Sequence, residues 1–488
     1  MASVCGITHQ GDRAHPQSGR TPLIDMLASS ASDRFILHCI AIPMVVLLVN
    51  AATATRILAE VVPNPLFTNG AVLQRDVKLP VWGTAADGEK VTIQFAGQRV
   101  TTQASQGKWL VHLEPLKASS SPQTLTITGN KRLEIKDLLV GDVWLCSGQS
   151  NMEWPIAKSA NGRAVAAKIR DPLIRLFEVA TTQSAVPLTQ AKGRWNHCEG
   201  KHAASFSAVA YYFGKDLHTH LKVPIGLIGS YVGASAADRW MSPMALRTLN
   251  IIPTERGPSS LYNGMIAPLQ PFPIRGVIWY QGEANRGRPS QYEKLFPALI
   301  ADWRAAWKQG PFPFLFVQLP PFNAIPPELR EIQAKVWKNT AHTGMVVITD
   351  HGSPTNIHPP VKEPVGKRLA LAARSIAYGE QLVWSGPIYR EMSIHQNRAV
   401  IHFNSTGSGL TAMPAGDALK GFTLAGSDGK FLPAEATIRG NQIEVSHPSI
   451  AAPVAVRFGW AAAPDLNLFN KEGLPAVPFR TDLPQPKL

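Results

Sequence analysis

Apolar and polar residues follow one another along this chain in three successive patterns. Between residues 60 and 136, short runs in which every second residue is apolar are separated by Gly, Asp and Ser, which is typical of a β-sandwich. From 137 to 378, short apolar runs alternate with stretches that repeat an apolar residue every three or four positions. Residues 379–488 return to short strands. We therefore predict an α/β domain flanked by N- and C-terminal β-sandwich-like modules.

The middle segment predicts repeated strand and helix units. The expected strands are 138–146, 174–179, 223–228, 276–280, 314–319 and 345–349, and the expected helices are 206–221, 237–249, 290–308, 327–339 and 364–378. Units of this kind form a doubly wound, mostly parallel sheet, whose ligands lie outside the carboxyl ends of the strands. In the last segment the expected strands are 398–403, 422–425, 442–445 and 454–460.

A hydrophobic segment precedes these domains. Residues 35–49 are mostly apolar, Arg34 comes before them, and small residues that fit an A-x-A cleavage site end at Ala54. This order is typical of a secretory signal, whereas a membrane anchor needs ~20 apolar residues. We therefore assign residues 1–54 to an N-terminal extension and a cleavable signal peptide. A secreted or periplasmic protein, with no stable membrane span after cleavage, is expected.

The composition narrows the classes of function. The chain has 488 residues, of which 45% are hydrophobic and 17% charged, as in folded globular proteins. Its net charge of +14 would fit a nucleic-acid partner, but the sequence contains no long basic run, zinc-finger spacing or RNA-binding motif. We expect no nucleic-acid binding, and an acidic sugar or polymer suits the charge better.

The cysteines predict no metal site. Two of the four lie within residues 1–54, and the remaining Cys146 and Cys198 could form a disulfide in an oxidising compartment or stay as two buried thiols. Cys146 ends a predicted central strand, which favours buried thiols. No CxxC pair or His/Cys cluster is present, so no zinc is expected.

The candidate chemistry centres on residues 138–156, LLVGDVWLCSGQSNMEWPI. An apolar run of strand length ends there in small and polar residues, which is how α/β enzymes present a hydroxyl at the carboxyl end of a central strand. The Oγ of a serine at such a turn is lifted out of the sheet, and backbone N–H groups point at an oxyanion beside it. Ser150 is therefore a candidate nucleophile, although a Ser/Gly/Asn cluster can also be an ordinary turn.

Four blocks of the sequence carry a family resemblance. They are GDVWLCSGQSNMEW (141–154), GLIGSYVGASAADRWMS (226–242), LYNGMIAPLQPFPIRGVIWYQGEAN (261–285) and VVITDHGSPTNIHP (346–359). In this order they resemble the sialate O-acetylesterase family, a branch of the SGNH/GDSL hydrolases, with GQSNM standing where other branches have GDS. The resemblance runs from about residue 60 to the end, and it implies an SGNH-type, flavodoxin-like, doubly wound sheet.

The resemblance implies that His358 is the base that activates Ser150, because the family places its histidine in this DxxxxxxxHP context. His351 is the alternative histidine in the same loop. Many SGNH enzymes have an aspartate three residues before the histidine, and many family members have one two before it. Those positions are Thr355 and Asn356 here, so the usual carboxylate is missing.

Two substitutes for that carboxylate remain. A loop carbonyl could accept from Nδ1 of the histidine, which leaves a Ser-His dyad, or Glu283 or Asp350 could reach the ring from another loop. We favour the dyad. Asp350, at a strand end, is expected to shape its loop, and Glu283 to brace the loop around it.

The expected oxyanion donors are the backbone N–H groups of Ser150 and Gly233. Glycine at 233 allows close approach to a ligand, and Ala234 stands where the family commonly has a second glycine. A side-chain amide completes such holes in SGNH enzymes, and the block WYQGEAN offers Gln281 or Asn285. We favour Gln281, directly after its strand, and leave Asn285 as a supporting residue of the loop.

These residues predict a carbohydrate O-acetylesterase that works through an acyl-serine and needs no metal or organic cofactor. The resemblance implies an O-acetylated sugar or glycan as partner, sialic acid first. An acetylxylan esterase is one alternative, and a non-catalytic sugar-binding protein on an SGNH scaffold is another. No oligomeric state follows from these residues.

Overall fold

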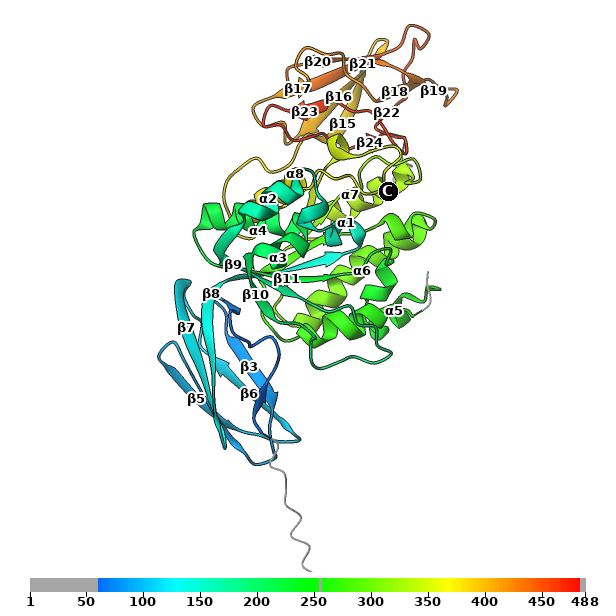
Figure 1. The fold of residues 1–488 in the computed structure, drawn as a ribbon. Coiled ribbons are helices and arrows are strands. Elements are labelled where there is room, and N and C mark those ends of the chain that lie inside the picture. The colour runs from blue at the N-terminus through cyan, green and yellow to red at the C-terminus, as the bar shows by residue number, and fades with distance from the viewer. Residues whose placement is uncertain (1–59, 254–256, 483–488) are drawn as a thin grey trace, which may run out of the picture. The chain divides into compact units, whose positions relative to one another are not determined.

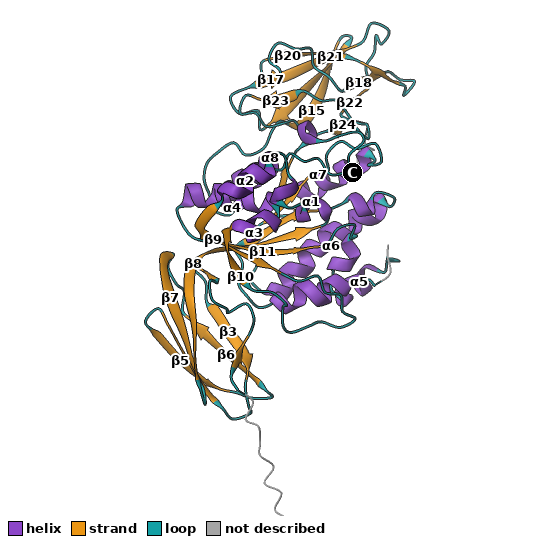
Figure 2. Ribbon diagram, viewed as in Figure 1, coloured by secondary structure: helices purple, strands orange, loops and turns teal. Residues whose placement is uncertain are grey.

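The structure is a computed structural model that describes residues 60–253 and 257–482 (Figure 1). The signal peptide expected within residues 1–54 lies outside the described residues. The fold is mixed α/β, with a large mixed sheet and additional β-sheet modules (Figure 2). Among the described residues, the search for an apolar helix long enough to span a bilayer finds none.

The large sheet carries the strands predicted for the middle segment. Its order is β10 (Trp195–Glu199), β9 (Arg170–Glu178), β11 (Ile225–Tyr231), β8 (Arg132–Gly148), β12 (Gly276–Tyr280), β13 (Phe314–Val317) and β14 (Thr343–Val346). All neighbours in this order are parallel except β10 and β9, which are antiparallel. The segment of β8 from Asp142 to Gly148 lies between β11 and β12 and is completely buried. Parallel strands buried on both faces read as continuous apolar runs, as this segment does.

Strand β8 also belongs to the N-terminal sheets. The N-terminal strands are β1 (Val62–Pro63), β2 (Val72–Gln74), β3 (Leu79–Thr84), β4 (Lys90–Phe95), β5 (Gln98–Gln103), β6 (Lys108–Leu113) and β7 (Ser119–Thr128). β1, β3 and β6 form one sheet, while β2 and β7 pair with the first part of β8. The boundary expected at residues 136 and 137 therefore falls inside one continuous strand.

The helices pack in two groups. They are α1 (Ser150–Glu153), α2 (Gly162–Lys168), α3 (Gly200–Ser205), α4 (Ala208–Leu221), α5 (Pro243–Leu249), α6 (Pro289–Trp307), α7 (Pro327–Asn339) and α8 (Glu363–Ile376). Helix α4 packs against α8, and α6 packs against α5 and α7. Short helical turns are η1 (Ile156–Lys158), η2 (Ala237–Trp240), η3 (Tyr262–Ile266), η4 (Ala267–Leu269), η5 (Glu283–Asn285) and η6 (Thr349–His351).

The helix expected over residues 237–249 is wrong as a single element. The structure has η2, a break at Met241 and Ser242, and then α5. Ser242 caps α5 by accepting a hydrogen bond from the N–H of Ala245, and Pro243 occupies the first turn of the helix. A serine cap followed by proline is a helix start, and it outweighs the apolar periodicity across the break.

The C-terminal module has its own apolar core. Its strands are β15 (Ile388–His395), β16 (Arg398–Asn404), β17 (Leu410–Ala412), β18 (Phe422–Ala425), β19 (Phe431–Pro433), β20 (Glu435–Arg439), β21 (Gln442–Ser446), β22 (Ala455–Phe458), β23 (Leu468–Asn470) and β24 (Phe479–Arg480). The four expected strands correspond to β16, β18, β21 and β22. The sequence analysis missed the others, most of which are short or partly exposed.

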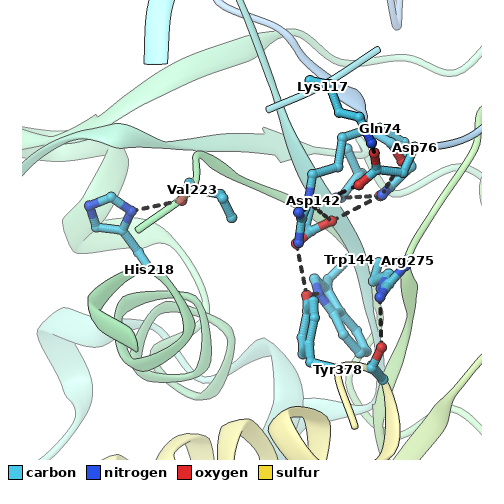
Figure 3. Close-up of polar contacts among 12 residues, drawn as sticks. Gln74, Asp76, Lys117, Asp142, Trp144, His218, Val223, Arg275 and Tyr378 are labelled. Atoms are coloured by element: carbon cyan, nitrogen blue, oxygen red, sulfur yellow. Dashed lines mark hydrogen bonds and ion pairs between the residues drawn. The ribbon is translucent and has the colours of Figure 1, made fainter. Parts of the chain in front are cut away.

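A buried carboxylate fixes the amino end of the parallel segment of β8 (Figure 3). Asp142 accepts hydrogen bonds from Gln74, the last residue of β2, from Arg75 after it, and from the hydroxyl of Tyr378, just after α8. The indole of Trp144 donates to the same hydroxyl at 3.2 Å. Both oxygens of this fully buried carboxylate are therefore satisfied, and the strand that leads to Ser150 is tied to two other elements.

The two cysteines in the described residues are free and buried. Burial raises the pKa of the Cys146 and Cys198 thiols, which keeps them protonated and unreactive. The prediction of two buried thiols is confirmed.

Candidate active site

Ser150 lies at the turn between β8 and α1. Gly148 before it has φ of 140°, and a Cβ there would lie 2.2 Å from the carbonyl oxygen of Tyr280, so only glycine fits. The carbonyl of Gln149 accepts from the N–H groups of Met152 and Glu153 and starts α1. Because Ser150 is the first residue of that helix, its own N–H has no acceptor within the helix.

The structure brings Ser150 and His358 together across 208 sequence positions. Ser150 Oγ and His358 Nε2 are 2.8 Å apart, within hydrogen-bonding distance, and both side chains are half-buried. His358 follows η6 in a loop whose shape depends on Asn356, since Asn356 Oδ1 accepts from the backbone N–H of His358 at 2.9 Å. A nucleophile and a base in this relation can carry out acyl transfer.

No carboxylate contacts the imidazole of His358 among the hydrogen bonds and ion pairs of the described residues. Asp350 is held by Arg368, with both oxygens 2.7 Å from the guanidinium, and also lies 3.3 Å from His351. Glu283 Oε1 instead accepts from Asn151 Nδ2 at 2.6 Å. Asp350 thus binds within its own loop and to Arg368. Neither the carboxylate of Asp350 nor that of Glu283 contacts the imidazole of His358.

Asn151 connects the nucleophile turn to the histidine loop. Its Nδ2 donates to Glu283 and to the carbonyl oxygen of Ile357, the residue before His358, at 3.0 Å. Its Oδ1 accepts from Lys362 Nζ at 2.5 Å. All of the side-chain amide's polar atoms are therefore engaged, and the two segments that carry the reacting side chains are joined directly.

The groups around Asn151 are buried and ionisable. Lys362 is 1% exposed, and burial lowers its pKa to about 7 although nearby Glu283 opposes this. Burial also raises the pKa of Glu283, whose Oε2 is buried and accepts no hydrogen bond from the described residues. Burial and the positive charge of Lys362 together lower the pKa of His358, which favours the neutral ring that a general base requires.

Trp154 stacks on the histidine. The ring centroids of Trp154 and His358 are 5.1 Å apart, and their planes differ by 23°. The ammonium group of Lys362 lies 5.9 Å from the Trp154 ring and 5.4 Å from the ring of Tyr280. The face of the His358 ring is therefore covered by an aromatic neighbour.

The second block lies beside the nucleophile. A Cβ on Gly233 would be 3.6 Å from Ser150 Cβ and 3.1 Å from Glu153 Oε2, and the N–H of Gly233 takes part in no hydrogen bond among the described residues. Ala234 has φ of 56°, in the left-handed region, which explains why glycine suits this position. Gly233 therefore lies next to Ser150, with an N–H that is not engaged elsewhere among the described residues.

The side chain of Gln281, which the sequence favours as the amide of the oxyanion hole, is engaged within the loops. Gln281 Nε2 donates to the carbonyl oxygen of Ser235 at 3.1 Å and to Asn285 Oδ1 at 2.7 Å, so both of its N–H groups are used within the loops. Asn285 Oδ1 also accepts from the N–H of Ala237, while Asn285 Nδ2 is buried and has no acceptor among the described residues. The uncommitted amide is that of Asn285.

The sequence analysis overlooked Trp154, Asn151 and Lys362. Asn151 and Trp154 lie in the first block, at one and four residues after Ser150, and Lys362 follows His358 by four residues. Proximity in sequence to both reacting side chains was the available signal. A search of the described residues finds no cluster of three or more His, Cys, Asp or Glu side chains arranged for a metal ion.

The chain is similar to known carbohydrate esterases. A family model described as "Carbohydrate esterase, sialic acid-specific acetylesterase" matches residues 140–374. Human sialate O-acetylesterase is 30% identical over 477 residues, which cover 84% of this chain and 90% of the human protein. The rat sialate O-acetylesterase is 31% identical over 415 residues, 67% of this chain and 75% of the rat protein.

One solved structure is similar to this chain over the whole of its own length. The carbohydrate acetylesterase XAC1771 from Xanthomonas citri is 42% identical with a TM-score of 0.83, and the match covers 87% of this chain and 100% of that one. The resemblance stated from the four blocks is confirmed by these similarities. This chain belongs to the sialate O-acetylesterase family of carbohydrate esterases.

Proposed function

We propose that this protein hydrolyses acetyl esters of sugars through an acetyl-Ser150 intermediate, with His358 as the general base and no carboxylate on the imidazole. The observation that carries this proposal is the 2.8 Å contact between Ser150 Oγ and His358 Nε2. Family membership supports the esterase class, since the relatives are named as sialate O-acetylesterases and as a carbohydrate acetylesterase.

The reaction runs in two halves. His358 Nε2 takes the proton of Ser150 as Oγ attacks the acetyl carbonyl carbon, and the electrons of the C=O bond move to its oxygen. When the tetrahedral intermediate collapses, the C–O bond to the sugar breaks and the sugar oxygen takes the proton from Nε2. Water, deprotonated by the same nitrogen, then attacks the acetyl carbonyl, releases acetate and restores the Ser150 hydroxyl.

The oxyanion is stabilised by hydrogen-bond donors that surround the nucleophile. The N–H groups of Ser150 and Gly233 supply the backbone part, because neither is used elsewhere in its own segment. We assign the side-chain part to Asn285 rather than Gln281, because Asn285 Nδ2 is the uncommitted donor. Removal of one such donor typically lowers turnover by about 10²–10³-fold.

We propose an O-acetylated glycan as the substrate, with O-acetylated sialic acid the first candidate. The names of the mammalian relatives and the net charge of +14 support an acidic sugar. Acetylated xylan is the second candidate, since the solved relative is named a carbohydrate acetylesterase without reference to sialic acid.

We propose further that the catalytic domain is of the doubly wound SGNH type. The parallel order β9, β11, β8, β12, β13, β14 and the two separate helix groups support this arrangement. A division into modules at residues 60–136, 137–378 and 379–488, and secretion directed by residues 1–54, remain proposals from the sequence.

Release of acetate by purified protein tests the function. Wild type should hydrolyse p-nitrophenyl acetate, and Ser150→Ala should reduce kcat at least about 10³-fold. His358→Ala should cause a loss of similar size, while His351→Ala, the matched control in the same loop, should retain kcat within about twofold. A wild type no more active than Ser150→Ala would support the sugar-binding alternative. Acetate released from O-acetylated sialic acid and from acetylated xylan then ranks the substrates.

A further inference from the structure

The imidazole of His358 has no carboxylate partner among the described residues, although a histidine that activates a serine ordinarily has one. In serine hydrolases that carboxylate fixes the ring and stabilises the imidazolium that forms when the serine loses its proton. Here the positive charge of Lys362 opposes formation of that imidazolium. Among the described residues, the ring of His358 makes a hydrogen bond to Ser150 and a stacking contact with Trp154.

The stacking geometry suits both tasks of the missing group. A centroid distance of 5.1 Å and an interplanar angle of 23° are those of stacked aromatic rings. Such a contact restricts rotation of the imidazole about its own axis. The face of an indole also attracts a cation, and tryptophan does so more strongly than the other aromatic side chains.

Trp154 itself is held by rigid elements. Its carbonyl oxygen accepts from the N–H of Ala208 at 2.9 Å, in the first turn of α4, and the next residue, Pro155, forms a β-bridge with Ser207. Ser207 caps α4 through the N–H of Ala210. These contacts fix the backbone from which the indole projects, between the nucleophile turn and a long helix.

Other contacts hold the histidine loop without fixing the ring plane. Asn151 binds the carbonyl of Ile357, and Asn356 accepts from the backbone N–H of His358. These bonds position the backbone, and they leave rotation about the side-chain bonds of the histidine free. Besides the hydrogen bond to Ser150 Oγ, the stacking with Trp154 is the interaction among the described residues that bears on the ring itself.

We propose that Trp154 is a positioning residue that replaces the carboxylate of a serine triad: its indole fixes the plane of the His358 ring and stabilises the imidazolium formed when Nε2 takes the proton of Ser150. This inference rests on the proposed function, and it adds the group that makes the dyad effective.

Two substitutions at position 154 separate the ring face from the volume it fills. Phenylalanine keeps a flat aromatic ring, whereas leucine has a similar bulk to phenylalanine without a π face. For p-nitrophenyl acetate, Trp154→Phe should keep kcat within about 4-fold of wild type, and Trp154→Leu should lose about 20-fold or more, with KM changed less than about 3-fold. The rate at which a fluorophosphonate modifies Ser150 should fall in parallel, since it depends on the same activation of the hydroxyl.

Trp82→Leu provides the control for loss of an indole elsewhere. Trp82 lies in β3 of the N-terminal sheet. Like Trp154 it is partly buried, and its ring packs edge-on against that of Phe67. It should change the melting temperature without lowering kcat. If Trp154→Leu does not fold, pentafluorophenylalanine at position 154 keeps the shape of phenylalanine but reverses its quadrupole, and kcat should then be about 5-fold below that of Trp154→Phe.

The outcomes are distinguishable. A folded Trp154→Leu variant with kcat within 2-fold of wild type, equal losses for Phe and Leu, or a change in KM alone would each overturn this inference while the esterase remains established. Equal kcat for phenylalanine and its pentafluoro analogue would also overturn it. Wild type with no more activity than Ser150→Ala would reject both the proposed function and the role of Trp154.

Discussion

The two ends of the buried segment of β8 use polar groups in different ways. At its amino end, both oxygens of Asp142 accept hydrogen bonds, and a guanidinium from Arg75 neutralises the charge (Figure 3). At its carboxyl end, Glu283 and Lys362 face each other across Asn151, and Glu283 Oε2 has no partner among the described residues. At the amino end both carboxylate oxygens have hydrogen-bond partners, whereas at the carboxyl end one carboxylate oxygen has none among the described residues.

The network around Asp142 holds the fold, whereas the network around Asn151 lies beside the reacting side chains. A buried carboxylate whose two oxygens both accept hydrogen bonds fixes a strand. A buried lysine whose pKa is about 7, next to the base His358, influences how easily that base takes a proton. A buried charged group therefore does not by itself indicate a functional site. A buried polar atom without a hydrogen-bond partner, next to a reactive side chain, does indicate one.

The largest expected effect is on stability at the amino end. Asp142→Ala should lower the free energy of unfolding by about 3–5 kcal/mol, because it leaves the guanidinium of Arg75 without its buried partner. Urea unfolding at pH 7 measures this. The matched control is Glu114→Ala, which breaks an exposed pair with Lys78 and should cost less than about 1 kcal/mol. Equal losses of stability in the two variants would mean that the buried ion pair of Asp142 stabilises the fold no more than an exposed pair does.

At the carboxyl end the main effect should fall on catalysis. Lys362→Met removes the donor to Asn151 Oδ1 and should lower kcat for p-nitrophenyl acetate about 10-fold, because the amide that joins the nucleophile turn to the histidine loop loses a fixed partner. Lys335→Met, which removes ion pairs with Glu293 on α6 and Glu331 on α7, should leave kcat unchanged. Full activity of Lys362→Met would show that the network is structural at both ends.

The pH dependence should report the charge beside His358. Burial and Lys362 hold the pKa of His358 below its ordinary value of 6.5. Because the base must be neutral, kcat/KM should be full above that pKa and should fall as the pH drops through it, so the acidic limb lies below pH 6.5. In Lys362→Met the limb should move to higher pH, since the positive charge is gone. A limb that stays in place would mean that Lys362 does not act on His358.

The smallest expected effect concerns the second block. Ala234 has φ of 56°, which glycine adopts without strain. Ala234→Gly should therefore raise the free energy of unfolding by about 1 kcal/mol, and kcat should change less than about 2-fold. Ala157→Gly, in a turn without positive φ, is the control and should not stabilise. A destabilised Ala234→Gly would show that the loop tolerates its alanine for another reason.

The sequence pattern was sufficient for much of the fold. The helix predicted at 327–339 is α7 without change, and the strands predicted within or next to the four blocks are present, because buried parallel strands and amphipathic helices have distinct periods. The broken helix at Met241 and Ser242 shows the limit, since a local cap overrode the apolar spacing. Nor did the pattern indicate that β8 continues from one sheet into another.

The candidate site was predictable where a motif names a residue. Ser150 and His358 lie in recognisable blocks, and the structure places them within 2.8 Å. The choice between Gln281 and Asn285 was not predictable, because it depends on which amide finds acceptors in loops far away in sequence. The stacking of Trp154 depends in the same way on a contact between distant segments.

The central claim is that Ser150 and His358 form an effective pair without a carboxylate on the imidazole. The most direct test is kcat/KM of Thr355→Asp and Asn356→Asp, which restore an aspartate at the two positions where relatives have one. The account predicts values within about 3-fold of wild type for both, since the ring is already positioned. A gain of 10-fold or more in either variant would contradict it.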